Sequence, residues 1–181
     1  YDCYWQPEAF AAADLLLTDD VPQTDHINES GYFVGPPAPD FTLPDTHGTP
    51  TTLSDLRGTP VLVVLVPFAF SPTCTSELCE LRDNIEDFET AGVRLLVVST
   101  DAVFTLKAWQ AAEGYQFDLL SDFWPHGEVA RAYGVFDESS GIALRGTFLI
   151  DADGIVRWCV VNPRGQARDL LYTALELGVN S

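Results

Sequence analysis

The sequence feature that most constrains the fold is the apolar run Val61–Val66. Six consecutive valine and leucine residues are typical of a strand that is buried on both faces, as in a sheet covered by helices. Pro67 ends the run, and apolar residues then recur at helical spacing from Leu78 to Phe88. This spacing predicts a helix over about 74–90, closed by a glycine. A buried strand followed by a helix favours an α/β fold.

The rest of the chain alternates strand and helix patterns. We expect strands at 41–43, 51–53, 93–98, 118–120, 147–150 and 155–161, and helices at 103–113, 128–133 and 166–177. The turn Asp151-Ala152-Asp153-Gly154 indicates a hairpin between the last two strands, and Gly114 marks the end of a helix. This order predicts one α/β domain, a mixed central sheet with helices on both faces.

Residues 1–35 differ in pattern from the rest of the chain. One short helix over 7–17 is followed by a polar stretch over 19–30 and then by the glycine- and proline-rich loop 35–39. We therefore expect an N-terminal extension of unknown role at 1–35 and a folded domain at 36–181.

The chain is strongly acidic, with a formal net charge of −18. Nucleic acids and anionic membranes require clustered cations, so both classes of partner are excluded. A solubilising surface explains the charge, and adaptation to high salt is the alternative, because salt screens the repulsion. No apolar run reaches the roughly 20 residues of a transmembrane helix. Four cysteines are too few for a disulfide scaffold, and with no signal peptide recognised we expect a cytoplasmic protein.

Cys74 opens the helix that follows the buried strand, a position where the active sites of open α/β sheets gather. Helix-initial N–H groups stabilise an anion, so a thiol placed there is biased toward the thiolate. Thr73 is the expected helix cap. Chemistry that builds negative charge on a leaving oxygen needs fixed donors nearby. Ser71 offers a hydroxyl, and Arg145 at the mouth of a strand offers a cation that keeps its charge.

Four segments of the chain carry a recognisable pattern. The first is Pro67-x-x-x-Ser71-x-x-Cys74, and the others are Ala38–Phe41, Arg145–Phe148 and Ser121–Gly127 with Ala132–Val135. The first resembles the active-site motif Pro-x-x-x-Thr/Ser-x-x-Cys of the peroxiredoxin family. The next two are similar to the family's N-terminal signature and to its arginine-bearing segment. The last resembles the alkyl hydroperoxide reductase E subgroup of actinobacteria.

The resemblance implies a thioredoxin-like fold and a thiol-dependent peroxidase for hydrogen peroxide and small alkyl hydroperoxides. It implies that Cys74 attacks the peroxide and becomes a sulfenic acid, in a pocket shaped by Pro67, Ser71 and Arg145. A thioredoxin-like protein or a low-molecular-weight thiol would act as reductant, without a metal or organic cofactor. The family commonly forms homodimers, and a monomeric state is the alternative. Because of the acidic surface, we expect neutral peroxides to react faster than anionic ones at low salt.

Cys79 follows Cys74 by five positions. This spacing resembles the peroxiredoxin Q (bacterioferritin-comigratory) subgroup, in which the second cysteine resolves the sulfenic acid. In an intact helix, residues five apart have Cα atoms about 8.6 Å apart, whereas a disulfide needs less than about 7 Å. The start of the helix must therefore unwind if Cys79 resolves. The alternative is that Cys79 is a small buried residue of that helix.

The remaining candidate residues carry less information. Cys159 lies in an apolar strand and is expected to be buried and inert, whereas Cys3 is either an alternative resolving thiol or incidental. The three histidines are far apart in sequence, so no metal site is expected. Tyr133 and Trp124 are expected to be packing residues.

Three rival functions stay open. A disulfide reductase of the thioredoxin type would need a Cys-x-x-Cys motif, which the sequence lacks. A redox sensor or adaptor would turn over slowly and act on a partner through residues 1–35. A peroxiredoxin scaffold recruited to other sulfur or oxidation chemistry is the third.

Overall fold

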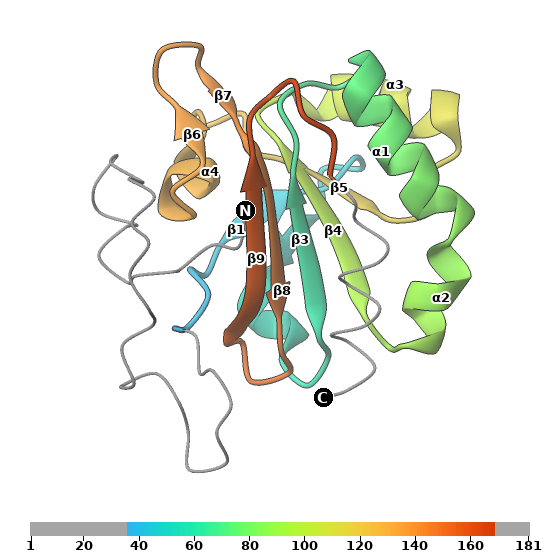
Figure 1. Ribbon diagram of the computed structural model, residues 1–181, viewed down its shortest axis with the longest axis vertical. Coiled ribbons are helices and arrows are strands. Elements are labelled where there is room, and N and C mark those ends of the chain that lie inside the picture. The colour runs from blue at the N-terminus through green and yellow to red at the C-terminus, as the bar shows by residue number, and fades with distance from the viewer. Residues whose placement is uncertain (1–35, 169–181) are drawn as a thin grey trace.

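The computed structural model describes residues 36–168 of the chain (Figure 1). The extension predicted at 1–35, with Cys3, lies outside the described residues, so the division of the chain at residue 35 stays a prediction. Most of the closing helix predicted at 166–177 also lies outside them. Its first residues, 166–168, are described, and they form a bend and irregular chain instead of a helix.

A five-stranded mixed sheet forms the centre of the described domain, in the order β5-β4-β3-β8-β9 (Figure 1). Its strands are β3 Val61–Leu65, β4 Arg94–Ser99, β5 Asp118–Ser121, β8 Arg145–Ile150 and β9 Val156–Asn162. The first three run parallel, whereas β8 is antiparallel to β3 and β9 is antiparallel to β8. The buried run of the sequence is confirmed as the central strand, and all residues of β3 are buried.

Both faces of the sheet are covered. One face carries α1 Pro72–Asp83, α2 Ile85–Thr90 and α3 Val103–Glu113 (Figure 1). The other carries α4 Glu128–Ala132 and the hairpin of β1 Thr42–Pro44 and β2 Pro50–Thr52, followed by the 3-10 helix Leu53–Leu56. Successive residues of β3 point to opposite faces, so Leu62 packs with the first set and Val63 with the second. The predicted mixed sheet with helices on both faces is confirmed.

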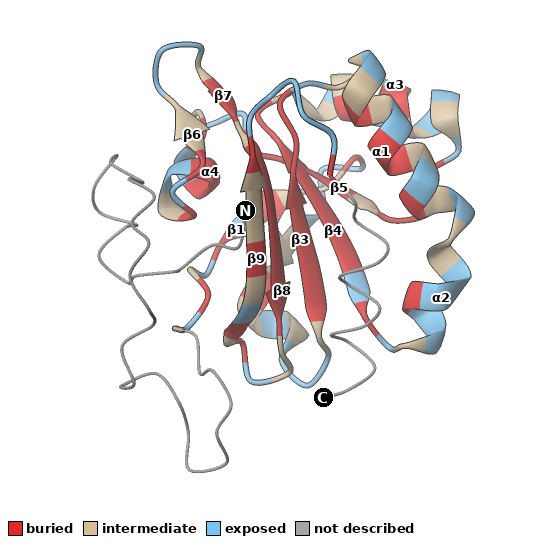
Figure 2. Cartoon of the chain, in the orientation of Figure 1, coloured by how far each residue is buried: buried red, intermediate tan, exposed pale blue. Residues whose placement is uncertain are grey.

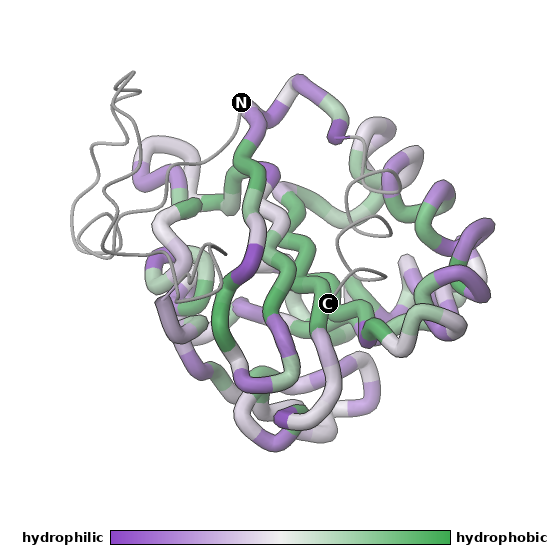
Figure 3. The backbone as a smooth tube through the Cα atoms, turned by 60° about the horizontal axis from the view of Figure 1, so that its bottom comes forward, coloured by the Kyte–Doolittle hydropathy of each residue, from purple (hydrophilic) through white to green (hydrophobic). Residues whose placement is uncertain are grey.

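Burial follows this layering. Figure 2 shows buried residues concentrated on the strands and exposed residues on the turns and outer helix surfaces. Figure 3 shows hydrophobic residues along the central strands and hydrophilic ones toward the outside. The sheet therefore forms the buried centre of the domain. The carboxyl ends of its parallel strands β3, β4 and β5 share one edge, which is where ligands bind in open α/β sheets.

The single long helix predicted after the buried strand is wrong in its start and in its continuity. α1 begins at Pro72 and ends at Asp83, and α2 begins at Ile85. The break falls at Asn84, whose Nδ2 donates to the backbone oxygen of Glu80 at 2.8 Å. That oxygen is the acceptor that the N–H of Asn84 would use in a continuous helix. The asparagine side chain thus competes with the backbone and ends the helix.

The predicted hairpin between the last two strands is confirmed. Oδ1 of Asp151 accepts the backbone N–H groups of Asp153 and Ile155, which closes the turn. Gly154 has a φ of +80°, a conformation that glycine adopts without steric cost.

The remaining elements differ little from expectation. α3 ends at Gly114 as predicted. The hairpin of β6 Phe136–Asp137 and β7 Ile142–Ala143 was not predicted, because strands of two residues are too short to show alternation. None of the helices within residues 36–168 is long and apolar enough to cross a membrane.

Candidate active site

Cys74 lies in the first turn of α1, just beyond the carboxyl end of β3. Ser71 precedes the helix, with extended backbone, and its Oγ accepts the N–H of Cys74 at 3.3 Å. Pro72 is the first helical residue, where its fixed φ and missing N–H are favourable. The cap predicted at Thr73 is therefore wrong, because the proline starts the helix one residue before it.

The sulfur of Cys74 combines deep burial with one charged neighbour. The residue is 0% exposed and belongs to the apolar core that includes Leu78. Nη2 of Arg145 lies 3.4 Å from the Cys74 sulfur. The structure thus brings together two predicted site residues that are 71 positions apart in the sequence.

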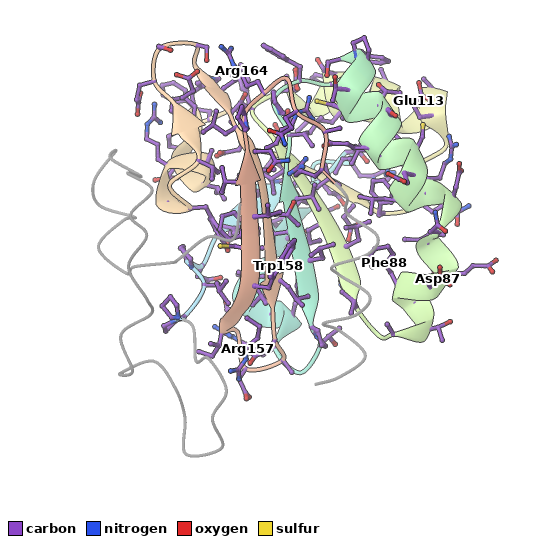
Figure 4. All side chains as sticks on the ribbon, viewed as in Figure 1. Asp87, Phe88, Glu113, Arg157, Trp158 and Arg164 are labelled. Carbon is purple, nitrogen blue, oxygen red and sulfur yellow. The ribbon has the colours of Figure 1, made fainter. Side chains whose placement is uncertain are left out.

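Arg145 is the first residue of β8 and is only 2% exposed. Each of its side-chain nitrogens has its own partner. Nη2 faces Cys74, Nη1 donates to Oε2 of Glu77 at 2.5 Å, and Nε donates to the backbone oxygen of Arg164 at 2.6 Å. Arg164 lies in the segment that follows β9 (Figure 4). Because a guanidinium is planar, these bonds fix its orientation against the sulfur.

Arg168 is a site residue that the sequence pattern does not reveal. It is 4% exposed, and its Nη2 lies 3.0 Å from Oε2 of Glu77. Its Nη1 donates to the backbone oxygens of Leu65 and Gly146 at 3.0 and 2.8 Å, which joins the ends of β3 and β8. Burial lowers the pKa of Arg168 from its ordinary value, and Glu77 opposes that change. Arg168 belongs to no sequence motif. The signal that could have pointed to it is Glu77, a carboxylate close to Cys74, which needs cationic partners when it is buried.

Glu77 lies between the two guanidinium groups and is 2% exposed. Within residues 36–168, the ion pairs of this cluster join two guanidinium groups to one carboxylate, which leaves one positive charge unbalanced. Unpaired buried charge is costly. The cluster therefore favours an anion beside Arg145, either a thiolate at Cys74 or a negatively charged oxygen next to it.

The loop before α1 is held in a strained conformation. Pro67 is buried at its start, and the N–H of Ala69 donates to Oδ2 of Asp101 at 2.8 Å. Phe70 has a φ of +61°, which is uncommon for any residue other than glycine. Such a conformation persists where the surroundings hold it, and the Phe70 ring lies 6.1 Å from the ring of Trp109. These contacts fix the residue that caps α1.

Cys79 lies further along α1, beyond its first turn, and is half-buried. Its thiol donates to Oε2 of Glu113 on α3 at 3.6 Å. Cys74 and Cys79 are both free thiols on one intact helix, whose geometry places their Cα atoms about 8.6 Å apart. The structure therefore does not bring the two sulfurs together.

The weaker candidates lie away from this pocket. Cys159 is buried on β9, as predicted. Tyr133 is buried and its hydroxyl donates to the backbone oxygen of Pro39, whereas Trp124 is 81% exposed, so its assignment as a packing residue is wrong. Within residues 36–168, no three His, Cys, Asp or Glu side chains gather as a metal site would require.

Comparison with known proteins gives consistent matches. The AhpC/TSA family pattern matches residues 34–159. The chain is 47% identical over 137 residues to alkyl hydroperoxide reductase E of Mycobacterium tuberculosis, covering 75% of this chain and 90% of that protein. It is 41% identical over 123 residues to peroxiredoxin Bcp of Escherichia coli, covering 65% and 78%.

A solved structure has the same fold. The crystal structure of peroxidoxin BcpB from Mycobacterium tuberculosis matches with a TM-score of 0.69 and 31% identity, covering 81% of this chain and 93% of that one. The predicted thioredoxin-like fold and the resemblance drawn from the four sequence segments are both confirmed. The chain belongs to the AhpC/TSA family and is a peroxiredoxin.

Proposed function

We propose that this peroxiredoxin, a thiol-dependent peroxidase, reduces hydroperoxides with Cys74 as the attacking thiol and Arg145 as the cation that assists it. The observation that carries the proposal is the 3.4 Å distance between Nη2 of Arg145 and Sγ of Cys74. A buried sulfur beside a fixed, permanently charged donor suits a reaction in which negative charge moves from sulfur to a leaving oxygen.

In the first step, the Cys74 thiolate attacks the distal oxygen of ROOH. The S–O bond forms while the O–O bond breaks, and the bonding pair leaves with the RO⁻ fragment, which takes up a proton to become ROH. Sulfur is oxidised to a sulfenic acid and the peroxide is reduced. Arg145 is held by Glu77 and the Arg164 carbonyl, so it can follow the charge from sulfur to oxygen without reorienting.

Ser71 and Pro67 act through the geometry of the pocket. Ser71 Oγ already accepts the N–H of Cys74, so this serine orients the first turn of α1, while its hydroxyl hydrogen remains available to a peroxide oxygen. Pro67 is buried where β3 ends, and it starts the loop that leads to Ser71. Both residues therefore position the sulfur.

In the second step, Cys79 condenses with the sulfenic acid. The Cys79 sulfur attacks Sγ of Cys74, the S–O bond breaks, and the leaving hydroxide combines with the thiol proton as water. α1 must open between Cys74 and Cys79, because a disulfide needs Cα atoms less than about 7 Å apart. A thioredoxin-like protein or a low-molecular-weight thiol then restores both thiols by disulfide exchange.

The substrates that fit best are hydrogen peroxide and small alkyl hydroperoxides. Because Cys74 is 0% exposed, a peroxide reaches the sulfur only when the pocket opens, and a small peroxide needs the smallest opening. A net charge of −18 slows the approach of anionic peroxides at low salt. A homodimer, common in this family, is compatible with the chemistry, since all of these side chains come from one chain.

The experiment is intact mass spectrometry after one equivalent of hydrogen peroxide, on wild type, Cys74→Ser and Cys79→Ser. Wild type should lose two hydrogens, Cys79→Ser should gain one oxygen on the Cys74 peptide, and Cys74→Ser should do neither. Oxidation that persists in Cys74→Ser would contradict the assignment of the attacking thiol. A stable sulfenic acid in wild type would contradict the role of Cys79 and leave the role of Cys74 standing.

A further inference from the structure

The part of α1 that follows its first turn is attached to the end of α3, away from Arg145. The Cys79 thiol donates to Oε2 of Glu113 at 3.6 Å, and Nη1 of Arg82 donates to the backbone oxygen of Glu113 at 2.7 Å. Glu113 is the last residue of α3 and lies beside the ribbon of α1 (Figure 4). Since Cys79 and Arg82 are three residues apart on α1, a single residue of α3 holds two neighbouring positions on one helix face.

The end of α3 explains why this backbone oxygen accepts a bond from α1. Gly114 follows Glu113 in the left-handed conformation, with φ +69°, and ends the helix. The last carbonyl groups of a helix have no partner within the helix. Arg82 supplies the missing donor for Glu113, and Oδ1 of Asp83 holds the arginine in place through Nε at 2.8 Å.

Tyr115 completes the surroundings of Cys79. It is 4% exposed, and its hydroxyl makes no hydrogen bond that meets normal geometry within residues 36–168. Burial first, and then the neighbouring Cys79, raise the pKa of Tyr115 well above its ordinary value. The phenol is therefore neutral, and it lies beside the Cys79 thiol that donates to Glu113.

These contacts oppose the movement that the second step needs. Cys79 reaches Cys74 only when this part of α1 unwinds, and unwinding separates both Cys79 and Arg82 from Glu113. We propose that Glu113 is a positioning residue for the resolving step, and that its contacts with α1 set how long the Cys74 sulfenic acid persists before the disulfide forms. This inference rests on the proposed role of Cys79 as the resolving thiol.

The test compares Glu113→Gln and Arg82→Ala with wild type. Each protein is mixed with one equivalent of hydrogen peroxide and quenched over time with a thiol-blocking reagent, and sulfenic acid and disulfide are followed by mass spectrometry. Glu113→Gln replaces a hydrogen bond to a charged acceptor by a weaker one to a neutral amide, and Arg82→Ala removes one hydrogen bond. In each variant the sulfenic acid lifetime should therefore shorten about threefold to tenfold. Formation of the sulfenic acid should keep its wild-type rate, since neither residue contacts the Cys74 pocket.

Glu80→Gln is the matched control. Glu80 is exposed on α1 next to Cys79, and its substitution removes one carboxylate without touching the contacts with α3. Its sulfenic acid lifetime should stay within about twofold of wild type.

Hydrogen exchange gives a second measurement that is independent of the peroxide chemistry. In a Cys74→Ser background, Glu113→Gln should raise the exchange of α1 amides around Cys79 and leave the strands unchanged. An increase spread over the whole domain would indicate general destabilisation and overturn the inference.

Two other outcomes separate this inference from the proposed function. If wild type forms the disulfide but both variants keep or lengthen the sulfenic acid lifetime, Glu113 does not hold α1 closed and only this inference falls. If the wild-type sulfenic acid accumulates and no disulfide forms, the role of Cys79 falls and the inference falls with it.

Discussion

The two cysteines of α1 lie on one helix but in opposite surroundings. Cys74 is 0% exposed, and the guanidinium of Arg145 lies 3.4 Å from its sulfur. Cys79 is half-buried, and its thiol donates to the carboxylate of Glu113, 3.6 Å away. The first environment suits an anion, whereas in the second the thiol donates to a carboxylate.

The difference comes from the elements that face each part of the helix. The start of α1 meets β8 and the segment that follows β9, which supply Arg145 and Arg168. The later part of α1 meets the end of α3, which supplies Glu113 and the nearby phenol of Tyr115, whose hydroxyl makes no well-formed hydrogen bond with residues 36–168. The charged groups near Cys74 are joined by several buried hydrogen bonds, and we call this the tightly bonded side of α1. The contacts near Cys79 are fewer, and we call this the loosely bonded side.

Glu77→Gln removes the carboxylate from the tightly bonded side, and we expect this substitution to have the largest effect. Removal of the carboxylate leaves two buried guanidinium groups facing each other, which should lower the free energy of unfolding by about 3–5 kcal/mol. Urea denaturation measures this change in the free energy of unfolding. Glu86→Gln, an exposed position on α2, should change it by less than about 0.5 kcal/mol. A loss below about 1 kcal/mol for Glu77→Gln would show that the cluster is not tightly coupled.

Arg145→Lys keeps the positive charge but loses the planar fork. A lysine cannot contact the sulfur, Glu77 and the Arg164 carbonyl with fixed geometry. We expect kcat/KM for hydrogen peroxide to fall about 10²-fold to 10³-fold, as when one preorganised donor is removed. Arg94→Lys, at the surface pair with Asp118, is the control and should leave kcat/KM unchanged. A decrease of less than about threefold for Arg145→Lys would mean that charge alone is sufficient.

Ser71→Ala tests the start of the helix. Loss of the cap should lower the free energy of unfolding by about 1 kcal/mol, whereas Thr73→Ala, inside the helix, should change it by less than about 0.5 kcal/mol. Thermal or urea unfolding of both variants shows which of the two residues caps the helix. The opposite ranking would restore Thr73 as the cap.

Tyr115→Phe tests the loosely bonded side and should have the smallest effect. The buried hydroxyl makes no well-formed hydrogen bond within the described chain, so its removal should leave the free energy of unfolding unchanged or raise it by up to about 1 kcal/mol. A decrease of more than about 2 kcal/mol would show that this hydroxyl is strongly bonded, and the contrast between the two sides would disappear.

The fold could be predicted from the sequence where the local pattern and the tertiary environment agree. The run Val61–Val66 has no polar face, so only a central strand accommodates it. The turn at Asp151–Gly154 specifies its own closure through the Asp151 side chain. The pairing of Cys74 with Arg145 was predicted from the resemblance to a family, because no local pattern connects residues 71 positions apart.

The remaining features depend on contacts that the sequence pattern does not show. The break at Asn84 results from one side-chain bond to Glu80, which apolar spacing does not register. Glu77 has the spacing of an ordinary helix residue, and it is identified as a site residue only once Arg145 and Arg168 are seen on either side of it. Likewise, the contact of Cys79 with Glu113 requires the packing of α1 against α3.

The most direct test of the account compares two reagents at the Cys74 sulfur. In Cys79→Ser, the rates of oxidation by hydrogen peroxide and of alkylation by iodoacetamide are measured on the Cys74 peptide and compared with the same rates for free cysteine. If the pocket favours O–O cleavage, the peroxide rate should exceed that of free cysteine by a far larger factor than the alkylation rate does, at least about 10²-fold larger. Equal factors for the two reagents would mean that the pocket merely exposes a reactive thiolate, and the account would be contradicted.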